Sequence, residues 1–312
     1  MDTRSLIKFG RTSYAVTLPQ SWIKKEGLKK GSSLYLEENH NGLIVSSNTN
    51  VTKRQIQKID MDITGKDLPR IKRELISHYI NGYDLVRIRG KDLINKSKAI
   101  REITHSLVAF EVIDQASSHM TAKIFLKASV LSIPQFIRKI DIINRNMMQD
   151  LTADVVDYDD IFQRDEDVDR FTFLVLRIIK SNLQDASSNR LTKINNADLL
   201  DYWNIAYILE AIADGIRDLA IVLKDISKNK IAFADILKLY EVLVENYVEA
   251  MNSYYSKDTN KAYKLSIRRK DIYKNCDRLY DKHWNKKGVA IALERIKDIS
   301  SLVHNLCRRI YS

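Results

Sequence analysis

The chain has 312 residues, of which 45% are apolar and 29% are charged, and this globular composition excludes wholesale disorder. Nine Gly and three Pro residues are too few for an all-β protein, and no apolar run reaches the ~18 residues that a transmembrane helix needs. Nine of the eleven excess positive charges lie in residues 1–130, which indicates either contact with a polyanion or a solvated lysine-rich surface.

The first fifty residues are predicted to form short strands, one helix and a hairpin. A strand is expected over 13–18, a helix over 20–27 and a second strand over 33–37. The Asn-His-Asn-Gly sequence at 39–42 is a hairpin signal, and 43–45 is the expected return strand. A segment this short buries too small a core to be stable alone, so we expect it to share apolar surface with a second copy.

Residues 51–130 alternate between strand and helix patterns, and they predict a small α/β module. Asn81-Gly82 marks the end of its first helix. The strands are expected over 55–63, 85–89, 110–114 and 120–126, and the helices over 67–80 and 96–107.

From Pro134 onward the chain has no further Pro, and apolar residues recur every three or four positions, which predicts an antiparallel helical bundle. The motif L-E-x-I-x-D occurs at 209–214 in the third predicted helix and again at 293–298 in the sixth. This repetition indicates two related three-helix halves. The six helices are expected over 133–158, 160–186, 195–227, 231–255, 259–284 and 286–311.

Pairs of acids four residues apart mark these helices, and such pairs project from one helix face. Two facing pairs offer four carboxylates around one point, a donor set that binds cations inside helical bundles. The alternative is a solvated acidic face balanced by Arg170, Arg217 and Arg295. The candidate pairs are Asp165/Asp169, Glu210/Asp214 and Glu294/Asp298, with Asp277 accompanied by Tyr273 instead of an acid.

No catalytic constellation stands out in the sequence. The six histidines show no metal-ligand spacing, and no phosphate-binding glycine loop or nucleophile motif is present. A metal-dependent hydrolase would lack a positioned base, so we expect no enzyme activity. Two cysteines and the lack of a signal-peptide pattern predict a cytoplasmic protein.

Residues 4–47 carry a specific pattern. Gly-Arg-Thr-Ser at 10–13 and Val-Thr-Leu-Pro at 16–19 precede Trp22, and Gly-Leu-Lys-Lys-Gly follows at 27–31. This segment resembles the SpoVT/AbrB (MazE-like) swapped-hairpin family, although Ser32 stands where that family often has Asp. The resemblance implies that two chains exchange hairpins into one small barrel that binds DNA. The basic residues that match the DNA-binding face are Arg4, Lys8, Arg11, Lys24 and Lys25.

Residues 133–312 resemble the PhoU family of phosphate-response regulators. The resemblance implies two three-helix repeats whose acidic motifs bind multinuclear iron or zinc. Tyr273 replaces an expected acid and weakens the second metal cluster. The positions that match the metal-binding motifs are Asp165, Asp169, Glu210, Asp214, Asp277, Glu294 and Asp298.

A chain that combines these two segments is similar to archaeal PhoU-type regulators. The two resemblances imply an α+β, mainly α fold with a swapped-hairpin domain at 1–50, an α/β linker module at 51–130 and a PhoU-like bundle at 131–312. The expected function is a dimeric, DNA-binding transcription regulator of phosphate uptake, with a transporter component or sensor protein as a further partner and no membrane insertion. Two alternatives stay open: a signalling adaptor that does not bind DNA, and an antitoxin-like partner that covers a toxin.

Overall fold

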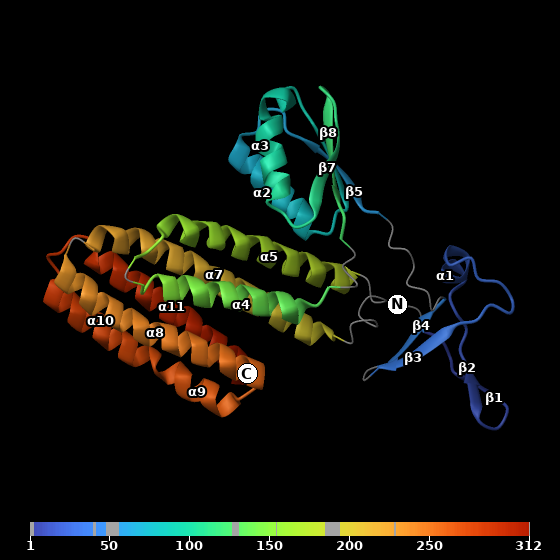
Figure 1. Cartoon of the computed structure of the whole chain (residues 1–312). Coiled ribbons are helices and arrows are strands. Elements are labelled where there is room, and N and C mark those ends of the chain that lie inside the picture. The colour runs from blue at the N-terminus through green and yellow to red at the C-terminus, as the bar shows by residue number, and fades with distance from the viewer. Residues whose placement is uncertain are drawn as a thin grey trace. The chain divides into compact units, whose positions relative to one another are not determined.

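The computed structural model describes residues 3–39, 42–47, 56–126, 131–153, 155–184, 194–227 and 229–311. The chain divides into two compact units, Met1–Gln55 and Ile56–Ser312, which we name the front unit and the rear unit (Figure 1). Each unit is described by itself. The predicted domain boundary at 50/51 lies outside the described residues, as does residue 130 at the second boundary, and both boundaries stay predictions.

Two short antiparallel hairpins and one helix form the front unit. The glycine between the first two strands, Gly10, has a φ of 72°, which a residue without Cβ adopts readily. The elements are β1 (Ile7–Phe9) paired with β2 (Ser13–Ala15), α1 (Gln20–Lys25), and β3 (Tyr35–Asn39) paired with β4 (Gly42–Ser46).

Three predictions for the front unit need correction. The strand expected over 13–18 ends at Ala15, because β1 offers only three residues as partners. The helix expected over 20–27 ends at Lys25, before Gly27 turns away with a φ of 64°. The strand expected over 33–37 is shifted to Tyr35–Asn39, in register with its partner β4.

The rear unit begins with a four-stranded sheet in the order β5-β6-β8-β7, as the sequence patterns predict for an α/β module. The parallel pair β5/β6 is connected by α2, whose first turn is capped by the Asp67 carboxylate, 2.9 Å from the Arg70 amide nitrogen. The elements are β5 (Lys58–Asp62), α2 (Leu68–Ile80), β6 (Leu85–Arg89), α3 (Leu93–His105), β7 (Phe110–Gln115) and β8 (His119–Ile124).

Seven described helices form the bundle of the rear unit, because the fifth predicted helix is divided at Arg268. No Gly or Pro marks this break, but the Ser266 carbonyl lies 3.0 Å from Nδ1 of His304 on the neighbouring α11. The first helix ends at Asp150 instead of 158. The helices are α4 (Ile133–Asp150), α5 (Tyr158–Gln184), α7 (Asn196–Ile226), α8 (Lys230–Ser256), α9 (Thr259–Ile267), α10 (Arg269–His283) and α11 (Val289–Tyr311).

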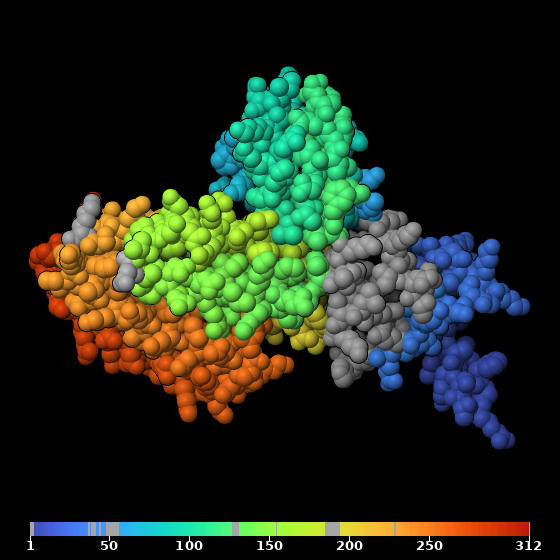
Figure 2. Space-filling view, viewed as in Figure 1, coloured from blue at the N-terminus to red at the C-terminus, as the bar shows by residue number. Residues whose placement is uncertain are grey.

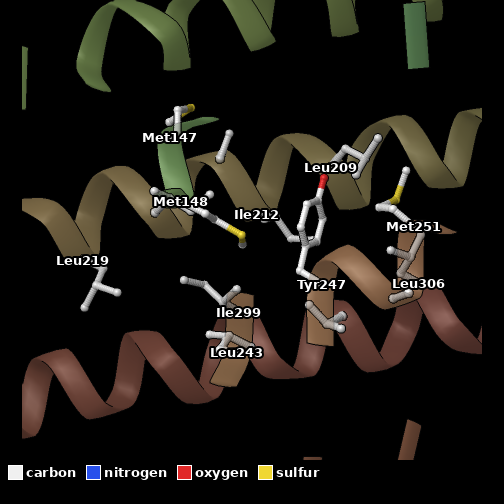
Figure 3. Close-up of a cluster of buried hydrophobic side chains, with 14 of the residues drawn as sticks. Met147, Met148, Leu209, Ile212, Leu219, Leu243, Tyr247, Met251, Ile299 and Leu306 are labelled. Atoms are coloured by element: carbon white, nitrogen blue, oxygen red, sulfur yellow. The ribbon is translucent and has the colours of Figure 1, made fainter. Parts of the chain in front are cut away.

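A continuous apolar core joins the two predicted halves of the bundle. Side chains such as Met148, Ile212 and Tyr247 meet between the helices (Figure 3). At Gly215 of α7, an added Cβ would lie 2.7 Å from Cγ1 of Ile299 on α11, so glycine permits the close approach of these two helices. No helix in the described ranges is long and apolar enough to cross a membrane.

A buried arginine of α5, Arg177, binds the sheet module to this helix. The module forms a distinct lobe of the rear unit (Figure 2). Arg177 Nη1 donates to the carbonyl oxygens of Tyr79 at 2.6 Å and Tyr83 at 2.9 Å. Its Nη2 donates to the Asp84 carboxylate at 2.7 Å. These bonds satisfy a charge that would be costly to bury alone, so the module is held in a defined place on α5.

Candidate functional site

The five basic residues of the predicted DNA-binding face are all exposed on the front unit. Arg4 precedes β1, Lys8 lies within it, and Arg11 lies in the β1–β2 turn. Lys24 and Lys25 form the last turn of α1. Figure 1 shows the β1–β2 hairpin extending away from α1, so Lys8 and Arg11 are carried by a different element from Lys24 and Lys25.

Large apolar side chains of the front unit are exposed as well. Leu6 is 67% exposed, Phe9 is 74% exposed and Leu36 is 64% exposed. Among the side chains described in this unit, none is buried. Apolar area left in water in this way contributes nothing to stability. The described part of the front unit therefore shows no buried core of its own.

The predicted acids of the first half-bundle do meet between α5 and α7, around one arginine. Arg217 Nη1 donates to Oδ2 of Asp165 at 2.6 Å and to Oδ1 of Asp214 at 2.5 Å. Its Nη2 donates to Asp218 at 2.9 Å. Burial opposes the charge of Arg217, but the hydrogen bonds to Asp218 and Asp165 raise its pKa further above the ordinary value. One guanidinium thus bridges carboxylates from two helices.

Two further acids of this cluster have no ion pair among the described residues. Burial, followed by the charges of Asp165 and Asp214, raises the pKa of Asp169 to about 6, against the opposing charge of Lys72. Burial, followed by the charges of Asp214 and Asp169, raises the pKa of Glu210 to about 7. Both carboxyls therefore exchange protons near neutral pH.

The second half-bundle pairs its acids differently. Lys297 Nζ donates to Oδ1 of Asp277 at 2.8 Å and lies 5.5 Å from the ring centre of Tyr273. The hydroxyl of Tyr273 is hydrogen-bonded at 2.8 Å to that of Ser301. Tyr273 thus contacts α11 in place of the acid that the spacing predicted. Lys297 forms an ion pair with Asp277, so this acid already has a cation beside it.

An ion-pair chain links the two halves across α7 and α11. Arg295 lies 3.4 Å from Asp218 of α7 and 3.4 Å from Asp298 of its own helix, while Glu294 is exposed. The sequence reasoning missed Asp218, although it stands four residues after Asp214, the same spacing that identified the other pairs. Of the three arginines named with the alternative of a solvated acidic face, Arg217 and Arg295 contact acids of the candidate pairs, whereas Arg170 pairs with Asp167.

Whether these acids fit a metal ion depends on their donor set and on their arrangement. No group of three or more acidic, histidine or cysteine side chains in the described ranges is arranged to hold a metal ion. The donors are all carboxylates, which suit hard cations better than zinc. Iron or zinc held by Asp165, Asp169, Glu210 and Asp214 would compete with Arg217 for two of the four ligands, and metal binding stays a prediction.

Comparison with known proteins identifies the front unit only. A family model described as antidote-toxin recognition MazE, bacterial antitoxin, matches residues 7–53. The front unit contains a MazE/AbrB-type domain. No curated protein and no solved structure matches the chain. The helical bundle is present as predicted, but its resemblance to PhoU rests on the sequence motifs alone.

Proposed function

We propose that the protein is a dimeric, DNA-binding transcription regulator whose front unit supplies both the DNA contact and the dimer contact. One observation carries the proposal: the MazE match over residues 7–53 falls on a unit with uncovered apolar side chains and exposed basic ones. A unit of this kind gains a core and a charged surface at once when two copies combine.

A second copy is the proposed cover for Leu6, Phe9 and Leu36. The front unit has two separate two-stranded sheets, and each leaves strand edges without a partner in the described part of that unit. Exchange of hairpins between two chains would pair those edges and bury the apolar side chains between them. The swapped-hairpin barrel is the arrangement that the resemblance implies for this step.

The same exchange supports DNA binding. Two-fold symmetry doubles the five basic residues of each chain, so the dimer presents ten positive charges to the duplex. Each phosphate neutralised by Lys or Arg releases condensed counterions, so the logarithm of affinity falls with the logarithm of salt concentration at ~0.9 per contact. Arg11 follows Gly10 in an exposed turn, where its planar guanidinium suits either a phosphate or a guanine edge.

For the rear unit we propose the role of sensor or relay in phosphate homeostasis, without enzyme activity. The support is the resemblance of 133–312 to PhoU. In addition, Arg295 lies near acids of both halves of the bundle, Asp218 and Asp298. A transporter component or a sensor protein is the proposed partner. Arg177 connects the acid-bearing α5 to the sheet module and gives the relay a physical route through the rear unit.

The test measures binding of the full-length protein to its own promoter DNA by fluorescence anisotropy at ~150 mM salt, a concentration at which phosphate contacts are partly screened. The double variant Arg11→Ala/Lys25→Ala should weaken binding by at least about tenfold and reduce the salt slope by about one per lost contact.

The matched control is Lys264→Ala/Lys270→Ala, which removes the same charge from exposed positions of α9 and α10. It should bind DNA as the unmodified protein does. If both double variants lost the same affinity for DNA, the effect would come from net charge alone. Unchanged binding by Arg11→Ala/Lys25→Ala would overturn the assigned DNA face.

A second candidate is favoured by the description of the matched family, which names toxin recognition. In that case the front unit covers a toxin, and a stable complex with the product of a neighbouring gene should form in co-purification. The adaptor alternative predicts a dimer without DNA affinity, together with capture of a phosphate-transporter component. Specific promoter binding without a toxin partner excludes both.

A further inference from the structure

A cleft of about 580 Å³ lies between α7 and α11 of the rear unit, next to the acid cluster. This volume is in the range of small-molecule sites, which are typically ~300–1,000 Å³. Its apolar lining comes from Ile208 and Ala211 on α7 and from Leu302 on α11. The cleft therefore offers room and an apolar wall for the body of a metabolite.

Two arginines that are consecutive in the sequence give the cleft its positive charge. Arg308 and Arg309 line it from the last turn of α11, and both are exposed. In the part of the chain that the structure describes, neither side chain has an ion pair or a side-chain hydrogen bond. Glu210 is the one acid in the lining, so the arginines outnumber it. A planar guanidinium from each arginine suits an anion with more than one phosphoryl group.

An aromatic ring and two amides line the same cleft. Tyr207 is 46% exposed, and its ring is braced by Trp203 at a centroid distance of 5.6 Å. Asn204 Nδ2 donates a hydrogen bond to the Leu200 carbonyl oxygen at 3.0 Å, so its Oδ1 is left as an acceptor for a ligand. Asn305 has no side-chain partner among the described residues. An exposed tyrosine face with amides beside it suits a planar, hydrogen-bonding ring.

We propose that this cleft binds a nucleotide, with the base against Tyr207 and the phosphates on Arg308 and Arg309. The three kinds of group converge here: cations for phosphate, an aromatic face for stacking, and amides for the base edge. The cleft shares Glu210 with the acid cluster, so a bound anion lies beside that cluster. The site is independent of DNA binding by the front unit.

The experiment is isothermal titration calorimetry of the full-length protein with three probes: ATP, inorganic tripolyphosphate and adenosine. ATP should bind once per chain and more tightly than either fragment, because only ATP reaches both the arginines and the tyrosine. Arg308→Ala/Arg309→Ala should weaken ATP and tripolyphosphate by at least about tenfold each.

Tyr207→Ala separates stacking from charge. It should weaken ATP by at least about fivefold and leave tripolyphosphate unchanged, because only the base contacts the ring. The control Lys286→Ala/Lys287→Ala removes the same charge from exposed positions before α11 and should bind all probes normally. Melting temperatures of all variants establish that they are folded.

Three results would overturn the proposal. If ATP shows no saturable binding, the cleft is not a nucleotide site. If both charge-matched double variants lose the same affinity for ATP, binding depends only on the net charge of the protein. Tripolyphosphate binding as tight as ATP, unaffected by Tyr207→Ala, leaves a phosphate site but removes the nucleotide.

Discussion

The front and rear units solve the problem of a hydrophobic core in opposite ways. The rear unit buries aromatic and aliphatic side chains such as Tyr247 and Ile212 completely, and its helices contact each other along their lengths. The front unit leaves Phe9 and Leu6 in solvent. The rear unit has a buried core and the described part of the front unit shows none, so dimerisation should be a property of the front and stability a property of the rear.

The largest expected effect is the loss of the dimer when the front unit is removed. A chain of residues 56–312 should sediment as a monomer and keep its cooperative thermal transition, because the rear core is intact without residues 1–55. Sedimentation velocity and circular dichroism measure both properties. A truncated chain that remains dimeric would place the dimer contact on the bundle and break the comparison.

The next effect comes from matched apolar truncations in the two units. Leu209→Ala opens a cavity in the buried core, and it should lower the free energy of unfolding by ~2–5 kcal/mol, independent of protein concentration. Phe9→Ala should leave the unfolding of the rear unit unchanged and weaken the dimer. Chemical denaturation at two protein concentrations distinguishes these outcomes. A concentration-independent loss for Phe9→Ala would mean that the front unit has its own core.

The sequence predicted the local elements well where turn signals and periodicity agreed. The strand β6 occupies 85–89 as expected, and α2 ends before Asn81-Gly82. It failed where packing between distant residues decides, as at Arg268, where no helix breaker is present. It named Asp165 and Asp214 as members of acid pairs that can face each other, but it could not show that Arg217 would bridge them, because that contact depends on how α5 and α7 pack.

A smaller effect is expected from pH. Asp169 and Glu210 have pKa values raised to about 6 and about 7, so the folded chain holds protons that the unfolded chain has already released. Their contribution to stability is complete below the unfolded pKa values of ~4 and falls as pH rises towards 7. Asp169→Asn/Glu210→Gln should flatten this slope and raise stability at pH 8 by ~1 kcal/mol, since both groups are partly solvated.

Urea denaturation at pH 5 and pH 8 measures this slope. The control Asp277→Asn/Glu294→Gln changes the same residue types on the second half-bundle. It should leave the slope as it is in the unmodified protein. A slope unaffected by the first double variant would contradict the raised pKa values.

The smallest expected difference is in metal content. The first half-bundle offers four carboxylates, whereas Lys297 and Tyr273 occupy the second. After reconstitution with iron or zinc, elemental analysis should show a larger loss of metal for Asp169→Asn/Glu210→Gln than for Asp277→Asn/Glu294→Gln. The absence of any uptake by the unmodified protein would leave the acids as an arginine-paired face.

The central claim is that the front unit makes this protein a dimeric DNA-binding regulator. The most direct test is an electrophoretic mobility shift on the promoter region of its own gene, with the full-length chain and with the chain of residues 56–312. The full-length protein should give a discrete shifted band that survives competitor DNA, and the truncated chain should give none. An equal shift by the truncated chain, or no shift by the full-length protein, would contradict the account.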